Sequence, residues 1–429
     1  MQLMIARLLK NTLFSSSLTL ITGTVLAQLV PVFLQVYLRR VFGEEVFAAY
    51  ALYISLVGVI VIMSTLRYEM AIVLPRKDHD AANIFVLSIL LSALINLIFF
   101  TIIIVMKEEV AVLIDFPQEY SIWLYFVPLS AFLASSYRTI NFWLIRKKAF
   151  KASSLNKVFR RSGEGMVQGI GAGLKFPKAL VFGDISGNIL NILIGGYQML
   201  KKQFTFQYIK VSRIKINAKR YSEFPGFNLF PALLNTVSLL LPVFFVSRFF
   251  SDANVANFDL TRQVLLIPSA FISISISQVL LQQLSAKRNS GKSILGDLRN
   301  VFIALSTLAI LEVIILFFFG PDLFSLIFGE KWNDAGVYAQ ILVFGFALKF
   351  MVSPLSSVFI ALEKLKLNAV WQLLYFSMIF SLWFFRSWEA QEFLRMYMYV
   401  DLIAYGVYLL MIVYLTINYE KKTIQNGKI

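Results

Sequence analysis

Residues 67–78 read RYEMAIVLPRKD and separate two long apolar segments, at about 46–66 and 81–106. Each apolar segment is long enough to cross about 30 Å of hydrocarbon as an α-helix that rises about 1.5 Å per residue. The stretch between them carries charges of both signs and a proline. This alternation predicts a membrane protein in which residues 67–78 form a charged loop between two spanning helices.

The composition of the whole chain supports this interpretation. Of its 429 residues, 58% are apolar and 15% are charged, whereas soluble domains are roughly half apolar and about a quarter charged. The mean hydropathy is +0.73. The chain has no cysteine and one histidine, His79, so disulfides, thiolate chemistry and paired imidazoles are excluded. We therefore expect no catalytic residue, no metal and no cofactor.

Apolar segments of spanning length recur along the whole sequence and predict an all-α membrane protein. Short repeats support two related halves, because Pro31-Val32-Phe33 recurs as Pro242-Val243-Phe244. Six spans in each half give both halves the same membrane orientation, which is typical of parallel repeats and of alternating access. The twelve predicted spans are about 12–38, 46–66, 81–106, 120–145, 158–174, 179–200, 228–250, 255–282, 299–319, 335–360, 366–385 and 395–418.

The one long hydrophilic connection divides the chain. We predict an N-terminal six-helix bundle at 1–200, a cytoplasmic basic linker at 201–225 and a C-terminal six-helix bundle at 226–429. The linker mixes lysines and arginines with aromatic residues, which is typical of an amphipathic segment on a membrane surface. Lysines and arginines concentrate on the side of the two termini, so the positive-inside rule predicts that both termini are cytoplasmic. The formal net charge of +16 thus reflects the membrane, and we expect no nucleic-acid partner.

Three short motifs carry a resemblance to a known family. They are the stretch from Arg67 to Asn83, the sequence FPGFN at 224–228, and LTRQVLLIP at 260–268. Together with the twelve-span layout they resemble the polysaccharide-transporter branch of the multidrug/oligosaccharidyl-lipid/polysaccharide exporter superfamily. The resemblance implies a flippase for undecaprenyl-pyrophosphate-linked oligosaccharide in the bacterial inner membrane, serving O-antigen (lipopolysaccharide), capsule or exopolysaccharide synthesis. It also implies membrane lipid, a glycan polymerase and chain-length-control proteins as partners.

A diphosphate and its sugars require a polar, cationic path through the bilayer. The cations nearest to or within predicted spans are Arg67, Arg138, Arg262 and Lys349. Arg67 and Arg262 occupy comparable places in the two halves, and we expect these two to hold the diphosphate. The alternatives are a membrane anchor or an ion pair with Glu69 for Arg67, an intrahelical pair for Arg262, and snorkelling for Arg138.

Acidic side chains in or near spans are candidates for ion coupling. A carboxyl group of raised pKa can carry a proton, and a carboxylate with carbonyl groups can hold sodium. The candidates are Glu164, Asp259, Glu312 and Asp401. The alternative for each is a structural partner of a neighbouring cation.

Two other functions remain open. A drug or cation antiporter of the same superfamily requires an acidic cavity, whereas the cations above favour a cationic one. An integral-membrane polysaccharide polymerase or glycosyltransferase generally needs a large outer loop or catalytic acids beside the membrane. The predicted outer loops are all short, which favours a transporter.

Overall fold

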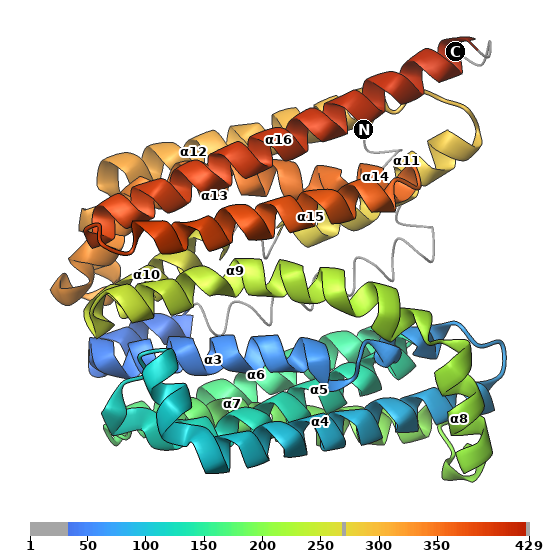
Figure 1. Cartoon of the computed structure of the whole chain (residues 1–429), viewed down its shortest axis with the longest axis horizontal. Coiled ribbons are helices and arrows are strands. Elements are labelled where there is room, and N and C mark those ends of the chain that lie inside the picture. Colours follow the sequence, from blue (N-terminus) through green and yellow to red (C-terminus); the bar gives the residue numbers. More distant parts are fainter. Residues whose placement is uncertain (1–32, 268–271, 426–429) are drawn as a thin grey trace. The chain divides into compact units, whose positions relative to one another are not determined.

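The computed structural model describes residues 33–267 and 272–425. Within these ranges the chain is helical with short connections and has no β-strand (Figure 1). Contacts divide it into two compact units, residues 1–240 and residues 241–429. The all-helical fold class predicted from the sequence is confirmed. The two units are described in turn below.

In unit 1 the long helices α3, α4 and α5 pack side by side (Figure 1). A helical segment precedes them at residues 33–41. The elements of unit 1 are α3 (Glu44–Ser64), η1 (Tyr68–Val73), α4 (Asp78–Leu113), η2 (Gln118–Phe126), α5 (Val127–Arg146), α6 (Phe150–Gly173), α7 (Ala179–Lys201), η3 (Phe206–Tyr208), α8 (Val211–Arg220), η4 (Phe224–Asn228) and the first part of α9 (Leu229–Phe249).

Helix α4 illustrates why these segments require lipid. Two aspartates lie in its first turn, where carboxylates are favoured by the positive end of the helix dipole. Beyond that turn its side chains are largely apolar, and large ones such as Leu94, Leu97 and Val105 are exposed. Such a long exposed apolar surface is stable in a bilayer, where the helix satisfies its own backbone hydrogen bonds. Unit 1 therefore presents α4 to the lipid.

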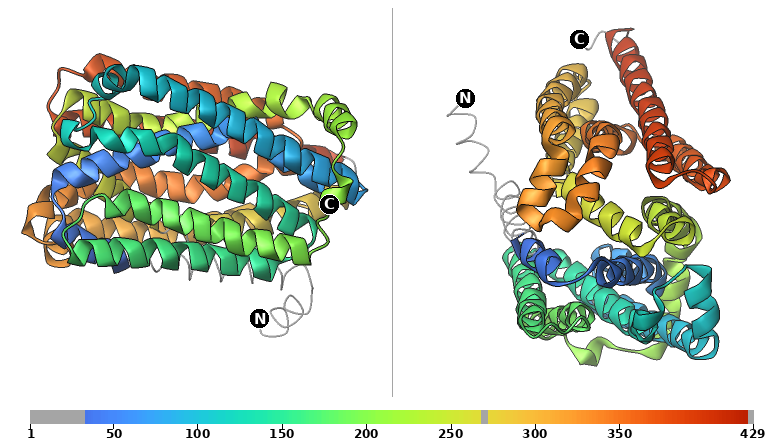
Figure 2. Two further views of the ribbon diagram at one scale, coloured as in Figure 1. Left: turned by 90° about the horizontal axis from the view of Figure 1, so that it is seen from below. Right: turned by 90° about the vertical axis from the view of Figure 1, so that its left-hand side faces the viewer.

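Helices α6 and α7 run side by side (Figure 2). They pack closely because glycines face the contact. A Cβ atom on Gly187 would lie 2.8 Å from the Arg160 carbonyl oxygen and 2.9 Å from the Glu164 Cβ. A Cβ atom on Gly183 would lie 2.4 Å from the Gln168 side chain. Small residues at such positions let helix backbones approach in membranes. The charged residues of α6 are thereby held against α7.

Unit 2 is built around α12, α13 and α16, which pack together in Figure 1. Gly336 of α13 lies against Pro321 of α12, where a Cβ atom would be 2.4 Å from the proline Cα. The elements of unit 2 are the rest of α9, α10 (Asp252–Leu265), α11 (Ile274–Asn289), α12 (Leu295–Phe328), η6 (Glu330–Trp332), α13 (Asn333–Val352), η7 (Ser353–Ser356), α14 (Ser357–Ala361), α15 (Leu365–Phe380), η8 (Ser381–Phe385) and α16 (Ala390–Gln425).

Eight helical segments in the described ranges are long and apolar enough to cross a membrane. The predicted spans at 120–145 and 158–174 correspond to η2 with α5 and to α6, which are too polar to be among them. The predicted span at 255–282 contains most of α10 and part of α11, and residues 268–271 between them lie outside the described residues. Most of the predicted span at 12–38, including Pro31, lies outside the described residues. The eight segments are Glu44–Ser64, Asp78–Leu113, Ala179–Lys201, Phe224–Phe249, Leu295–Phe328, Glu330–Ala361, Leu365–Phe385 and Ala390–Thr423.

The basic linker predicted at 201–225 is a folded part of unit 1. It contains η3, α8 and the start of η4, and both η3 and α8 pack on α4. The division between the two units falls further along the chain, between Leu240 and Leu241 inside α9.

The packing of α6 on α7 generates a prediction with an internal control. Gly187→Ala should lower the temperature at which the purified protein unfolds in detergent, because overpacking typically costs about 1–3 kcal/mol. Gly196→Ala on the same helix meets no atom within 4 Å, so it should be neutral or stabilise by up to roughly 1 kcal/mol. Equal unfolding temperatures for the two variants would contradict the close packing.

Candidate functional site

The loop between α3 and α4 reverses the chain through two strained residues. Leu66 and Arg67 have φ angles of 47° and 68°, in the left-handed region that L-residues rarely adopt. Each such residue costs on the order of 1 kcal/mol, which the surrounding structure must offset. The reversal starts η1 directly after Arg67 and buries Tyr68 and Glu69. A carboxylate is thereby placed inside unit 1.

Glu69 lies between two arginines. Its side chain is only 1% exposed, and its Oε1 atom lies 3.8 Å from Arg67 Nη1 and 3.5 Å from Arg138 Nε. Its other carboxylate oxygen accepts a hydrogen bond from the Thr65 hydroxyl. Arg67 Nε also donates to Asn228 Oδ1 at 3.2 Å. We call Arg67, Glu69, Arg138 and Asn228 the Glu69 cluster.

The Glu69 cluster carries more positive than negative charge. Two guanidinium groups face one carboxylate, and an arginine stays protonated in proteins. Burial and the neighbouring Arg138 guanidinium lower the pKa of Arg67, while Glu69 opposes that shift. The Oε1 atom of Glu69 accepts no hydrogen bond from the described residues. The carboxylate thus balances the arginines only in part and at ionic rather than hydrogen-bonding distance.

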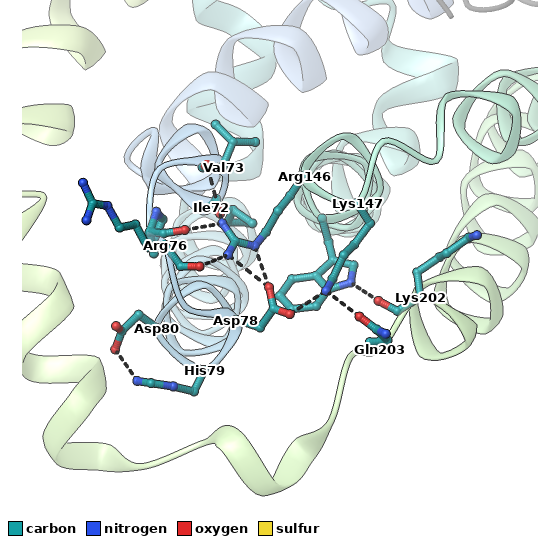
Figure 3. Close-up of polar contacts among 12 residues, drawn as sticks. Ile72, Val73, Arg76, Asp78, His79, Asp80, Arg146, Lys147, Lys202 and Gln203 are labelled. Carbon is teal, nitrogen blue, oxygen red and sulfur yellow. Dashed lines mark hydrogen bonds and ion pairs between the residues drawn. The ribbon is translucent and has the colours of Figure 1, made fainter. Parts of the chain in front are cut away.

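Arg146 holds the loop that presents the cluster (Figure 3). It lies in the last turn of α5 and donates from Nη1 to the carbonyl oxygens of Ile72, at 3.3 Å, and Pro75, at 2.6 Å. Asp78 forms ion pairs with both basic residues at the end of α5: its Oδ1 atom lies 3.0 Å from Arg146 Nη2, and its Oδ2 atom lies 2.5 Å from Lys147 Nζ. Loop carbonyls that have no partner within a helix are thereby satisfied. Arg146 therefore positions the loop and does not itself belong to the Glu69 cluster.

Helix α8 closes the loop from a second direction. The Tyr68 hydroxyl donates to the Ala218 carbonyl oxygen at 2.8 Å. Asn83 Nδ2 donates to the Tyr208 carbonyl oxygen at 2.8 Å, and the Lys210 amide donates to Asn83 Oδ1 at 2.9 Å. These contacts join the linker to η1 and to the start of α4.

A second charged group in unit 1 includes a predicted coupling residue. Glu164 Oε2 on α6 lies 2.9 Å from Arg161 Nη1. Arg160 reaches across to α7, where its Nη2 atom lies 3.3 Å from Asp184 Oδ1. Asp184 is 3% exposed and its Oδ2 atom accepts no hydrogen bond from the described residues. Glu164 therefore lies in a buried group of paired charges.

In unit 2 the structure brings together two residues for which the sequence suggested different roles. Lys349 Nζ on α13 lies 3.0 Å from Asp401 Oδ2 on α16. The Tyr375 hydroxyl donates to Asp401 Oδ1 at 2.8 Å. The aromatic rings of Phe346 and Tyr405 surround the ammonium group, with centroids at 4.8 and 5.3 Å. Lys349 and Asp401 form a buried ion pair inside an aromatic cage.

The other predicted residues of unit 2 are Arg262, Asp259 and Glu312. Arg262 Nη2 lies 3.8 Å from Asp259 Oδ1 on the same helix, the intrahelical pairing named as the alternative for Arg262. Gln263 Nε2 donates to Asp259 Oδ2 at 2.6 Å. Glu312 is half-buried on α12, whose side chains are mostly not buried. Arg67 and Arg262 thus lie in separate units, each close to an acidic residue near it in the sequence.

The profile of the family described as "Polysaccharide biosynthesis protein" matches residues 37–337. The chain belongs to this polysaccharide biosynthesis family. The matched range contains the whole Glu69 cluster and ends before Lys349 and Asp401. A search among curated proteins found no match.

Solved structures with the same fold are transporters. The chain is similar to an inward-facing multidrug resistance transporter of the MATE family, with a TM-score of 0.74 and 13% identity over 93% of this chain and 96% of that one. It is similar to the lipid II flippase MurJ in an inward closed conformation, with a TM-score of 0.71 and 12% identity over 94% and 90%. A Vibrio cholerae MATE transporter gives 0.66 and 14% over 98% of both chains. At these identities the likeness defines the fold.

Sequence reasoning missed two residues that this family member uses to build its charged groups. The sequence analysis identified neither Arg146 nor Asp184 as a site residue. Asp184 had a usable signal, because an acid inside a predicted span at 179–200 is costly without a partner. The role of Arg146 depends on loop carbonyls about 70 residues earlier in the sequence, which no local pattern reveals.

The anchoring of the loop is testable by hydrogen exchange. Arg146→Ala should speed amide exchange across residues 68–78, because Asp78 loses a charged partner and loop carbonyls lose donors. Lys151→Ala, which changes an exposed lysine five residues further on, should leave the exchange unchanged. Unaltered exchange in Arg146→Ala, measured by mass spectrometry in detergent, would show that the loop is held by other contacts.

Proposed function

We propose that this member of the polysaccharide biosynthesis family is a flippase for undecaprenyl-pyrophosphate-linked oligosaccharide. The observation that carries the proposal is the Glu69 cluster, a net positive group that joins residues of two family-like motifs to Arg138 of α5. The protein is a multi-pass membrane protein whose fold is shared by MATE transporters and MurJ. The proposed products are O-antigen, capsule or exopolysaccharide.

The chemistry of the cluster suits a diphosphate. An arginine presents a planar fork of donors that matches phosphate oxygens in a bidentate way. Arg67 uses Nε toward Asn228, and Nη1 faces Glu69 at 3.8 Å, beyond hydrogen-bonding distance. The Arg138 side chain is 32% exposed. Both guanidinium groups therefore retain donors for an anionic ligand.

Glu69 acts in this proposal as the resident counter-ion. Without cargo it limits the repulsion between the two neighbouring, partly buried arginines. A diphosphate brings more negative charge than one carboxylate and accepts hydrogen bonds that Glu69 Oε1 lacks. The diphosphate would thus replace Glu69, a carboxylate that is only weakly paired with the arginines, as their anionic partner.

The drug or cation antiporter is the second candidate because MATE transporters share the fold. A cationic drug would be repelled by the net positive Glu69 cluster, whereas a lipid diphosphate would be attracted. This sign of charge favours the lipid-linked glycan. An assay of the glycan distinguishes a transporter from a polymerase or glycosyltransferase, because an enzyme would lengthen or modify the glycan.

The remaining assignments follow from the proposed cargo. We place the protein in the bacterial inner membrane with both termini cytoplasmic and with alternating access between two bundles. Membrane lipid, a glycan polymerase and chain-length-control proteins are the proposed partners. Arg262 and Lys349 remain proposed contributors to binding the anionic cargo.

The proposal predicts a specific loss of transport. In proteoliposomes that contain the lipid-linked repeat unit, Arg67→Ala and Arg138→Ala should each lower the translocation rate at least about tenfold, because a charge-assisted phosphate contact contributes roughly 1.5–3 kcal/mol. Arg67→Lys should be intermediate because it keeps the charge and loses the fork. Arg76→Ala removes an exposed side chain from the same loop and should transport normally.

Full transport by both alanine variants would refute the diphosphate-binding role of the cluster. Transport of cationic drugs without transport of the lipid-linked glycan would favour the antiporter. Formation of a longer glycan by the purified protein would favour the enzyme.

We further propose that buried acids couple transport to an ion gradient, with Asp401 as the principal residue and Glu164, Asp259 and Glu312 as further candidates. Asp401 is 1% exposed and pairs with the ammonium of Lys349. A proton or sodium ion that binds the carboxylate weakens this pair. The energy of the gradient can in this way reach the contact between α13 and α16.

Paired variants separate coupling from stability. Lys349→Met alone should destabilise the protein, because it leaves a buried carboxylate without its cation at a cost of about 3–5 kcal/mol. Lys349→Met with Asp401→Leu should recover stability, measured as the unfolding temperature, and make transport insensitive to collapse of the proton and sodium gradients. The exposed pair on α16, Arg395 with Glu392, provides a control when both are changed to glutamine. An unchanged gradient response in the Lys349/Asp401 double variant would leave the pair a purely structural role.

A further inference from the structure

Helix α8 has one face against unit 1 and one face without a protein partner among the described residues. On the inner face Asn217 is buried, Arg213 Nη1 lies 3.0 Å from Asp80 Oδ1, and Ala218 accepts the hydrogen bond from Tyr68. These contacts fix the rotation of the helix about its axis. The opposite face, which we call the outer α8 face, is exposed and consists of Val211, Ser212, Lys215, Ile216, Lys219 and Arg220.

The outer α8 face combines large apolar side chains with positive charge. Val211 is 70% exposed and Ile216 is 64% exposed, and Phe206 just before the helix is 66% exposed. No acid lies beside these basic residues in the sequence, because residues 201–222 contain no aspartate or glutamate. A soluble surface rarely carries this combination without a partner.

The position of α8 identifies the level at which it lies. Asp80, which pairs with Arg213, is in the first turn of the spanning helix α4. The spanning helix α7 ends at Lys201, ten residues before α8 begins. Figure 1 shows α8 running across the end of α4 rather than along it. A helix at the ends of two spanning helices and transverse to one of them lies where the bilayer meets water.

We propose that the outer α8 face binds anionic phospholipid headgroups at the membrane surface. Its apolar side chains enter the headgroup boundary, and its lysines and arginine contact lipid phosphates, as expected for a basic amphipathic interfacial helix. The occupant is the bilayer and not a soluble partner, because the face continues the surface formed by the ends of α4 and α7. This assignment does not depend on the transported cargo.

Helix α8 is linked to the Glu69 cluster by one hydrogen bond and one peptide bond. Ala218 accepts the hydrogen bond from Tyr68, and Tyr68 follows Arg67 directly in the chain. Anionic lipid that holds α8 in place therefore restrains η1. Loss of anionic lipid frees the outer α8 face while leaving the Arg213–Asp80 pair intact.

The absence of native cysteine permits a direct test by site-specific labelling. Ser212→Cys on the outer α8 face is labelled with an environment-sensitive fluorophore, and the protein is reconstituted in phosphatidylcholine vesicles with or without phosphatidylglycerol. We expect blue-shifted emission and stronger quenching by nitroxide-labelled lipid when phosphatidylglycerol is present. Ser387→Cys, an exposed serine of unit 2, should show no such dependence.

A charge-neutralised variant distinguishes electrostatic lipid binding from passive contact. Lys215→Gln, Lys219→Gln and Arg220→Gln together should lower the effective binding equilibrium about 100-fold, because each basic residue contributes about fivefold. About 1 M salt should act in the same direction, since it shortens the screening length to about 3 Å. Equal emission and quenching with and without phosphatidylglycerol, or an unchanged response in the neutralised variant, would overturn the proposal.

Discussion

A carboxylate removed from water needs positive partners, and the burial of Glu69 is the constraint on which the loop between α3 and α4 depends. It obtains those partners from Arg67 beside it and from Arg138 on α5. The left-handed backbone at Arg67 is required to turn the acid inward, and Arg146 with α8 holds that geometry from outside. A strained turn, a buried charge and a docked linker are thus parts of one arrangement.

Most of the fold could be predicted from the sequence because lipid imposes a simple length and polarity rule. The segment at 81–106 became α4, and that at 179–200 became α7. The rule is weakest for α6, where Arg160, Arg161 and Glu164 interrupt the apolar pattern. Those charges are tolerated because α7 approaches closely at Gly187 and supplies Asp184. The docking of the linker depends on Asn83 and Asp80, which lie more than 120 residues away from it in sequence.

The sequence identified most members of the candidate site and the pairs between close neighbours in the chain, such as Arg67 with Glu69 and Arg262 with Asp259. Charged residues within apolar segments are easily found in the sequence, so Arg67, Arg138, Lys349 and Asp401 could be recognised as candidate site residues. Pairs between residues far apart in the sequence could not be predicted, because a pair such as Lys349 with Asp401 joins helices whose register is set by tertiary packing. The contact between Arg67 and Asn228 links two of the family-like motifs across 161 positions. Both residues belong to motifs that resemble the same family, but the motifs do not indicate that the two residues are in contact.

The division of the chain inside α9 has a mechanical consequence. The chain passes from one unit to the other within a continuous helix. Pro242 lies two residues beyond Leu240, and its ring nitrogen cannot donate to the carbonyl one turn earlier. A helix that lacks one backbone hydrogen bond bends more easily at that position. We therefore expect α9 to bend most easily near Pro242.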